Sequence, residues 1–306
     1  MRSSVAAAIA ALLLVACGPD VPPSTSALDD DAITVASFDF PESVTVAEIY
    51  AQALEAEGFV VERQLAIGPR ELVEPSLERG LVELVPEYAG SALEFLTGGA
   101  GLATSDEERT HARLAQAFAE RGVNVLTPAP AQNRNGFAVA RATAERHGLQ
   151  TLTDLSTVAG DLVFGGPPEC PERPLCLEGL EQTYGLEFAR FVVLDAGGPL
   201  TVSALRAGTV DIALLFTTDA AIDVNDFVLL EDDLALQPAE NVTPVLHAEA
   251  VESHGDRLVS VVNSVSELLT TEDLRSLNAA VAIGDQAPAG VAARWLAERS
   301  LADVSD

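Results

Sequence analysis

Two cysteines stand close together in the stretch GGPPECPERPLC, residues 165–176. Cys170 and Cys176 could ligate a metal ion, act as a redox pair or form a disulfide in a stiff loop. A structural zinc site prefers four nitrogen or sulfur ligands, and the sequence has no histidine within about twenty residues of this stretch. The spacing also differs from the C-x-x-C of thiol oxidoreductases. The compartment in which the chain works therefore decides the chemistry of the pair.

The first residues of the chain indicate export. Arg2 precedes an apolar run, Val5 to Ala16, that has the length of a signal-peptide core and is too short to span a bilayer. The run ends in LVAC, which resembles the lipobox of bacterial lipoproteins. This resemblance implies that residues 1–17 are a lipoprotein signal peptide and that Cys17 carries the lipid. The alternative is an ordinary signal peptide cut near Ala16.

With Cys17 acylated, Cys170 and Cys176 are the remaining thiols, and outside the cytoplasm such a pair is most simply a disulfide. Residues 18–31, GPDVPPSTSALDDD, offer little apolar surface to bury, so we interpret them as a flexible tether.

Charge and missing motifs exclude several functions. The formal net charge is −30, so the surface repels nucleic acid and anionic lipid, and we expect membrane contact through the lipid anchor only. The sequence has no G-x-S-x-G, P-loop or H-E-x-x-H motif, and its four histidines are scattered. We therefore predict no catalytic residue, no metal and no cofactor.

Strand-like runs alternate with helical patterns in two series. The first series predicts strands at 33–38, 59–65, 81–85 and 123–126, with helices capped by Ser43 and by Ser105 with Glu108, and a further helix at 69–79. The second predicts strands within 137–140, 162–166, 191–196, 210–216 and 227–232 and a helix at 199–207, and the pattern after His247 is nearly all helical. Strands separated by helices indicate parallel pairing through crossovers.

Two polar, proline-containing segments separate these series, PAPAQNRN at 128–135 and QPAEN at 237–241. We interpret them as paired crossings between two lobes. Lobe 1 then comprises residues 32–132 plus 241–306, and lobe 2 comprises residues 133–240.

Several stretches together resemble one family. They include SFDFPESVTVAEIYAQALEAEGF, PEYAGSALEFL, GGPPECPERPLCLEGLEQTYGL and ALRAGTVDIALLFTTDAAI, and the resemblance spans about residues 33–300. They are similar to substrate-binding proteins of osmoprotectant ABC transporters of the glycine betaine/choline type. The resemblance implies a two-lobed α/β type II periplasmic-binding-protein fold, with a mixed sheet flanked by helices in each lobe and two hinge crossings. Such lobes close around a ligand.

The same resemblance implies a function. The chain would be an extracytoplasmic lipoprotein, anchored to the outer face of the cell membrane. It would capture glycine betaine, choline or a related zwitterion and deliver it to ABC permease subunits, and we expect a monomer.

Family members hold quaternary amines in a cage of aromatic rings through cation–π attraction, with further groups on the ligand carboxylate. By resemblance, Tyr88 of PEYAG matches the first cage tyrosine, and Ser91 stands where the family has a threonine. Arg173 of ECPERP matches the arginine that pairs with the carboxylate, and Glu169 lies one turn before it.

Other family positions carry different residue types. They are Asn135, Val202 and Asn225 or Asp226 at further tyrosine positions, and Phe38 and Asp39 in place of a basic residue. Phe38, Phe137 and Phe216 could rebuild part of the cage, although phenylalanine in an apolar strand is usually core.

Structural roles compete at each of these positions. Arg173 would bind the ligand carboxylate or form a salt bridge with Glu169 or Glu172. Tyr88 ends a strand, where α/β sheets place ligands, and this position favours the cleft over the core.

Thr217 and Thr218 follow the strand VDIALLF. Their hydroxyls would reach the cleft, or Thr218 or Asp219 would cap a helix.

Competing functions remain open as well. They are a binding protein for another polar solute or an amino acid, a sensor or scavenger without transport, a secreted enzyme on the same fold, and a structural lipoprotein.

Overall fold

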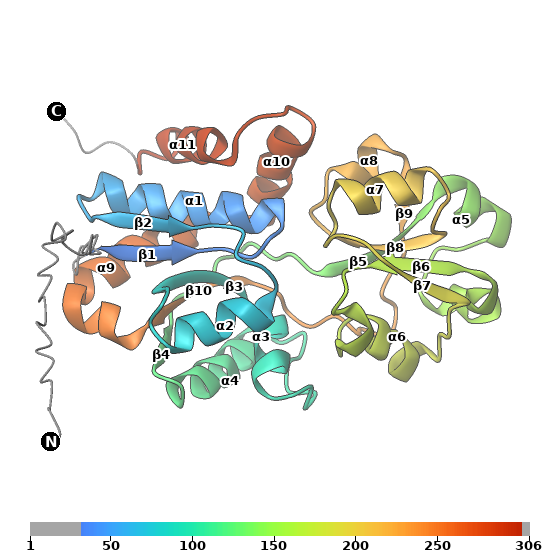
Figure 1. The fold of residues 1–306 in the computed structure, drawn as a ribbon, viewed down its shortest axis with the longest axis horizontal. Coiled ribbons are helices and arrows are strands. Elements are labelled where there is room, and N and C mark those ends of the chain that lie inside the picture. Colours follow the sequence, from blue (N-terminus) through green and yellow to red (C-terminus); the bar gives the residue numbers. More distant parts are fainter. Residues whose placement is uncertain (1–31, 302–306) are drawn as a thin grey trace, which may run out of the picture. The chain divides into compact units, whose positions relative to one another are not determined.

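A computed structural model describes residues 32–301, which form two five-stranded mixed sheets flanked by helices (Figure 1). The predicted signal peptide, Cys17 and the tether at 18–31 lie outside the described residues. None of the helices within 32–301 is long and apolar enough to cross a bilayer.

The first lobe is built on the sheet of order β2-β1-β3-β10-β4. Its strands are β1 (Ile33–Ala36), β2 (Val61–Gln64), β3 (Leu84–Tyr88), β4 (Val123–Val125) and β10 (Val242–His247). Strand β1 pairs in parallel with β2 and β3, whereas β10 runs antiparallel to β3 and β4. The chain therefore returns to the first sheet after it has built the second.

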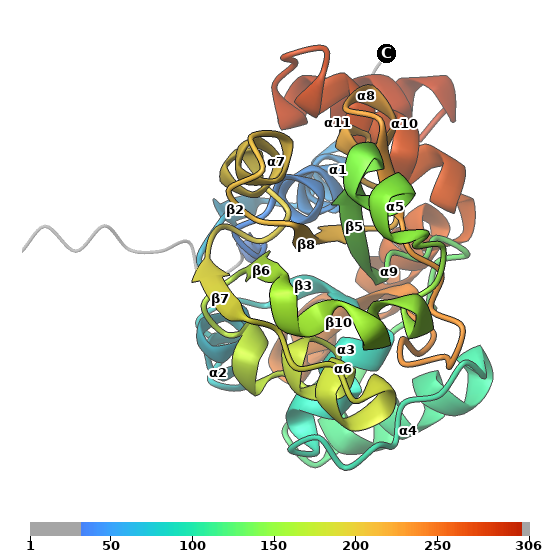
Figure 2. The same ribbon diagram turned by 90° about the vertical axis from the view of Figure 1, so that its right-hand side faces the viewer.

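Helices cover both faces of this sheet. They are α1 (Pro41–Ala56), α2 (Arg70–Glu78), α3 (Ala89–Leu96), α4 (Glu107–Ala119), α9 (Ala248–Leu268), α10 (Thr271–Ala282) and α11 (Pro288–Glu298). Helix α1 packs with α9, α10 and α11, while α2, α3 and α4 lie across the sheet from α1 (Figures 1 and 2). Val46, Ile49, Tyr50 and Leu54 are fully or almost fully buried, as expected from their 3-4 spacing on α1.

The second lobe is built on the sheet of order β7-β6-β8-β5-β9. Its strands are β5 (Asn135–Ala140), β6 (Val163–Gly166), β7 (Arg190–Val193), β8 (Ile212–Phe216) and β9 (Phe227–Leu229). Its α-helices are α5 (Arg141–His147), α6 (Leu177–Tyr184), α7 (Pro199–Arg206) and α8 (Ala221–Val224). Three short 3-10 helices, η1 (Thr153–Thr157), η2 (Ala159–Asp161) and η3 (Cys170–Glu172), join them.

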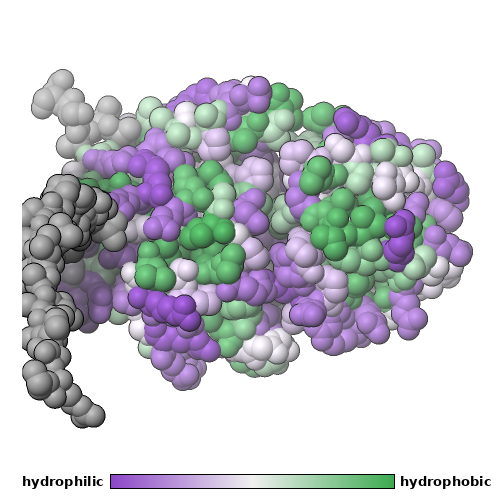
Figure 3. All heavy atoms as spheres, viewed as in Figure 1, coloured by the Kyte–Doolittle hydropathy of each residue, from purple (hydrophilic) through white to green (hydrophobic). Residues whose placement is uncertain are grey.

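Strand β5 is antiparallel to β8 and β9, whereas β6 is parallel to β7 and β8. Helices α6 and α7 lie on opposite faces of this sheet (Figure 2). An apolar patch shows on one face of this lobe (Figure 3).

Strand β10 is missing from the sequence prediction. Its sequence, VTPVLH, contains Pro244, and a proline argues against a central strand. In the sheet Pro244 lies opposite Pro86, where neither residue has an amide to donate. Because the two prolines face each other, a strand that contains proline can occupy an inner position of the sheet.

Two predicted helix caps are wrong. Helix α1 begins at Pro41, so Ser43 lies inside its first turn, and the Ser43 hydroxyl accepts a hydrogen bond from the Phe38 amide over 3.0 Å. Helix α4 is capped by Asp106 instead of Ser105, because the Asp106 carboxylate accepts the amide of Arg109 at 3.0 Å.

The two crossing segments run side by side. The Val242 amide donates to the Ala131 carbonyl over 2.9 Å, and the Asn133 amide donates to the Glu240 carbonyl over 3.1 Å. Gly90, at the start of α3, lets the second crossing approach, since a Cβ there would lie 2.4 Å from Pro238. The crossings thus form one hydrogen-bonded connection between the lobes.

Candidate functional site

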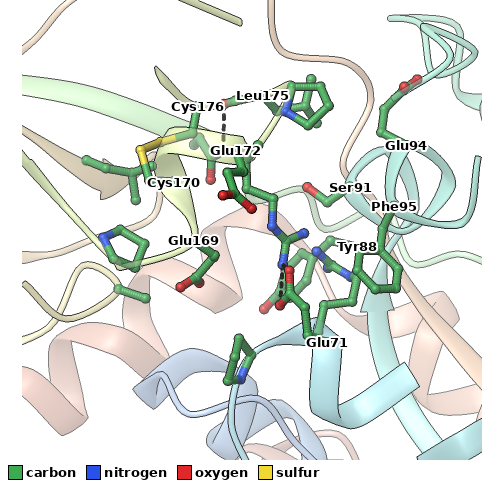
Figure 4. Close-up of a pocket in the computed structure, with 18 of the residues that line it drawn as sticks. Glu71, Tyr88, Ser91, Glu94, Phe95, Glu169, Cys170, Glu172, Leu175 and Cys176 are labelled. Carbon is green, nitrogen blue, oxygen red and sulfur yellow. Dashed lines mark hydrogen bonds and ion pairs between the residues drawn. A yellow bond between two sulfur atoms is a disulfide. The ribbon is translucent and has the colours of Figure 1, made fainter. Parts of the chain in front are cut away.

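A cavity of about 440 Å³ lies between the lobes, and residues of both lobes line it (Figure 4). This volume lies within the usual range for small-molecule sites. Seven of the residues that the sequence suggested for ligand binding line it, namely Phe38, Tyr88, Ser91, Asn135, Glu169, Arg173 and Phe216.

The disulfide loop forms one wall of the cavity. Cys170 and Cys176 are joined, and both are buried. The carbonyl of Leu175 inside this loop accepts hydrogen bonds from the side-chain amides of Asn135 and Gln237, each over 2.9 Å. Covalent and hydrogen bonds together hold the loop against the second lobe, and Asn135 acts here as a support.

Arg173 leaves this loop and crosses to the first lobe. Its Nη2 lies 2.7 and 2.8 Å from the two carboxylate oxygens of Glu71, at the start of α2. The guanidinium also lies over the ring of Phe95, 5.3 Å from its centroid. Neither Glu169 nor Glu172, the salt-bridge partners considered from sequence, is bonded to Arg173, because the side chain extends across the cleft.

Four aromatic rings form what we call the aromatic wall: Phe38, Phe40, Tyr88 and Phe216. Phe40 is central, with ring centroids 6.0 Å from Phe38, 5.8 Å from Tyr88 and 5.0 Å from Phe216. All four line the cavity, and Phe216 belongs to the second lobe. Sequence analysis missed Phe40, although its position two residues after Phe38 in FDFP gave a signal.

Phe137 belongs to the core instead. It is 1% exposed and packs against Phe164, with ring centroids 6.0 Å apart. It shares a face of β5 with Asn135, but it lies further along the strand, in the second-lobe core, and does not line the cavity.

Tyr88 and Ser91 are each held by a buried carboxylate. The Tyr88 hydroxyl donates to Glu42 at 2.8 Å, and the Ser91 hydroxyl donates to Glu240 at 2.6 Å. Burial, together with the Glu42 carboxylate, raises the pKa of Tyr88 well above its usual value, so the hydroxyl remains a donor. Burial raises the pKa of Glu240 to about 7, although the Ser91 hydrogen bonds oppose this shift.

Thr217 and Thr218 do not line the cavity, contrary to one of the two roles expected for them. The Thr218 hydroxyl donates to Glu42 at 2.5 Å, and the Thr217 hydroxyl accepts the Arg134 amide at 3.0 Å. These bonds direct both side chains to the crossing and to the first lobe. No backbone amide of a described helix donates to the Thr218 hydroxyl, whereas the Asp219 carboxylate accepts the amide of Ala221, the first residue of α8, over 2.8 Å, as the capping alternative expected for Asp219.

Val202, Asn225 and Asp226 also lie away from the cavity. Val202, on α7, packs against a hydrophobic cluster of the second lobe, Asn225 donates to the Ala221 carbonyl, and Asp226 pairs with Arg141. The family's further tyrosine positions in this lobe therefore have structural roles in this chain.

Arg70 is a cavity residue that sequence analysis missed. It lies over the Phe38 ring, 5.0 Å from the centroid, and donates two hydrogen bonds of 2.8 Å to the buried Glu87 carboxylate. Although burial opposes it, the Arg70 guanidinium holds the pKa of Glu87 below its usual value. Arg70 thus supplies positive charge near Phe38 and Asp39, where the family has a basic residue after the first strand.

The lining carries more acidic than basic residues. Its acidic members are Asp39, Glu71, Glu94, Glu169, Glu172 and Glu178, and its basic members are Arg70 and Arg173. Burial raises the pKa of Glu169. Within residues 32–301, no cluster of three His, Cys, Asp or Glu side chains could hold a metal ion.

Comparison with known proteins agrees with this architecture. A family model for the substrate-binding domain of ABC-type glycine betaine transport systems matches residues 31–298. A glycine-betaine-binding protein of Pseudomonas aeruginosa is 28% identical over 273 residues, or 86% of each chain. The glycine betaine-binding protein YehZ of Escherichia coli is 25% identical over 267 residues, 84% of this chain and 87% of YehZ.

A solved structure described as a glycine betaine/carnitine/choline ABC transporter covers 89% of this chain and 100% of its own, with a TM-score of 0.68 and 21% identity. This likeness confirms the predicted two-lobed type II fold. The match over residues 31–298 confirms the predicted family as well. The chain belongs to the family of substrate-binding domains of ABC-type glycine betaine transport systems.

Proposed function

We propose that this chain is an extracytoplasmic lipoprotein that captures a small quaternary ammonium solute between its lobes and delivers it to an ABC permease. Members of its family bind a transported solute and do not convert it. The relatives named above bind glycine betaine, and choline or carnitine are further candidates.

The aromatic wall is the observation that carries this proposal. Three of its rings come from the first lobe and Phe216 comes from the second, so closure brings them together around one volume. A desolvated cation gains about 2 kcal/mol or more from such ring faces. The surplus of carboxylates in the lining adds attraction for positive charge.

Ligand contacts are assigned within this proposal to Phe38, Phe40, Tyr88 and Phe216 for the cation, and to Ser91, Glu169 and Arg173 for polar groups. Asn135 supports the loop that carries Arg173. The lobes are residues 32–132 with 241–306, and residues 133–240, and they hinge at the two crossings.

Anchoring through Cys17 and a monomeric state complete the proposal. They rest on the lipobox resemblance and on the family. A sensor without a permease would bind the same solutes, and it would be favoured by a gene with no neighbouring permease and ATPase genes.

A thermal-shift screen tests the function. The purified protein is heated with glycine betaine, choline, carnitine, proline betaine, ectoine and the common amino acids. A ligand at a hundred times its Kd adds about 2.7 kcal/mol to the free energy of unfolding, which raises Tm by a few degrees. We expect quaternary amines to raise Tm and amino acids to leave it unchanged.

Two variants localise the effect. Phe40→Leu removes the central ring of the aromatic wall and should weaken binding about tenfold. Phe59→Leu removes a ring that packs on the first-lobe core outside the cavity, and it should bind as the unmodified protein does. Equal effects of the two substitutions, or no Tm shift with any quaternary amine, would overturn the proposal.

A further inference from the structure

The Arg173–Glu71 ion pair joins the two lobes directly beside the aromatic wall. Glu71 is the second residue of α2 in the first lobe, and Arg173 follows η3 in the second. The Nη2 of Arg173 is within 2.8 Å of both carboxylate oxygens of Glu71. The start of α2 favours negative charge, since the amides of a first helical turn carry partial positive charge.

The guanidinium has little freedom to turn elsewhere. The Arg173 side chain is 19% exposed, lies over Phe95 and leaves a loop closed by the Cys170–Cys176 disulfide. Its Nε is buried and has no hydrogen-bond partner among the described residues. The two bidentate edges of a guanidinium, Nε with Nη2 and Nη1 with Nη2, both include the nitrogen that Glu71 holds, so a carboxylate that binds Arg173 bidentately has to displace Glu71.

The second guanidinium of the lining is also engaged. Arg70 is bound by Glu87 through two parallel hydrogen bonds, and the Glu87 side chain has no exposed surface. Such bidentate pairs are among the stronger charged interactions in proteins. A ligand carboxylate would have to displace Glu71 or Glu87, and Glu71, which is 46% exposed, is the more easily displaced.

From this geometry we propose that Glu71 is a specificity-determining residue that occupies the carboxylate-binding position of Arg173 and selects cations without a carboxylate over zwitterions. A choline-like cation reaches the aromatic wall with the Arg173–Glu71 pair intact. A betaine must separate that pair and place its carboxylate near Glu169, Glu172 and the displaced Glu71. The inference deepens the proposed function and rests on it.

Calorimetric titration with choline and with glycine betaine tests this role. The measured quantity is the ratio of the Kd for glycine betaine to the Kd for choline. Glu71→Gln removes the competing carboxylate, so the ratio should fall about tenfold or more, mainly through tighter betaine binding. Glu252→Gln removes an exposed charge from α9, outside the cavity, and it should leave the ratio within about twofold.

A double variant shows whether the change passes through Arg173. Adding Arg173→Gln to Glu71→Gln should abolish the gain in betaine affinity. A gain that came from a general change in cavity charge would persist in the double variant. A ratio that stays constant in Glu71→Gln while both ligands bind overturns the role of Glu71 and leaves the proposed function standing. If neither ligand binds the unmodified protein or any variant, the proposed function is overturned, and this inference with it.

Discussion

The hydroxyl of Tyr88 donates to the carboxylate of Glu42 over 2.8 Å, and the same carboxylate accepts a hydrogen bond from Thr218 of the other lobe. Asn133 in the first crossing and Asn278 in α10 donate to Glu42 as well, over 2.7 and 2.6 Å. One buried carboxylate thus connects an aromatic side chain of the cavity, a crossing segment and both lobes.

Tyr88→Phe tests this connection because it keeps the ring and removes the donor. Three donors to Glu42 remain, so we expect the free energy of unfolding to fall by about 2 kcal/mol, as for a lost hydrogen bond to a charged group. Binding of a quaternary amine should change less than about threefold, since the ring face remains. Urea unfolding and calorimetric titration measure the two effects.

Tyr50→Phe is the matched control. Tyr50 is buried and its hydroxyl is hydrogen-bonded to Ser266 over 3.0 Å, with no charged partner in that bond. We expect a loss of about 1 kcal/mol and unchanged binding. A larger loss for Tyr50→Phe than for Tyr88→Phe would contradict the importance given to Glu42.

Removal of the disulfide, as Cys170→Ser with Cys176→Ser, should destabilise the protein and loosen the Arg173 loop. Closing so short a loop contributes about 2 kcal/mol in the chain-entropy account. We expect the urea midpoint to fall accordingly and ligand affinity to drop several-fold. Reductant should lower the midpoint of the unmodified protein and leave that of the double variant unchanged; a midpoint insensitive to reductant in both would refute the prediction.

Glu240 should make stability depend on pH. Burial raises the pKa of Glu240 from 4.5 to about 7 in the folded protein, so folding favours the protonated form of this carboxyl. Its contribution to stability is therefore complete below pH 4.5 and is lost as pH rises through 7. The loss is on the order of 3 kcal/mol.

Glu240→Gln keeps an acceptor for the Gly90 and Ser91 amides and cannot ionise. Relative to the unmodified protein, this variant should gain stability between pH 5 and pH 8 in urea unfolding. Glu252→Gln, on an exposed position of α9, controls for the change in net charge. Parallel pH profiles for the Glu240 variant and the unmodified protein would show that Glu240 is not responsible.

Cys17→Ala tests the lipid anchor predicted from LVAC. The unmodified protein should be found in the membrane fraction of expressing cells and incorporate labelled palmitate, because stable anchoring needs more than one acyl chain. The variant should incorporate no label and leave the membrane fraction. Equal distribution of the two proteins would argue for an ordinary signal peptide.

Local patterns in the sequence predicted much of the fold and part of the site. The apolar spacing of α1, the position of Tyr88 at a strand end and the turn-rich Cys170 loop depend on neighbouring residues only. The partners of these groups could not be predicted in the same way. Glu71 lies 102 residues from Arg173, and Glu42 lies 176 residues from Thr218, so only the folded chain brings them together.

Prediction from residue type failed where hydrogen bonds to distant residues set the position of a side chain. Thr217 and Thr218 follow an apolar strand, where a cleft position and a helix cap were both expected, but polar partners hold them at the crossing. Phe40 was missed although it stands two residues after Phe38, and Arg70 was missed because its own segment does not distinguish it from a surface arginine. They acquire a role only when β1, α2 and β8 meet.

The position of β10 also sets the order in which a nascent chain can complete its parts. Every strand of the second sheet lies within residues 135–229, whereas the first sheet needs residues 242–247 between β3 and β4. A chain that emerges from its N-terminus during translocation can therefore assemble the second sheet while the first still lacks an inner strand. The ligand cavity, which needs both sheets, becomes available only after β10, about four-fifths of the way along the chain, has arrived.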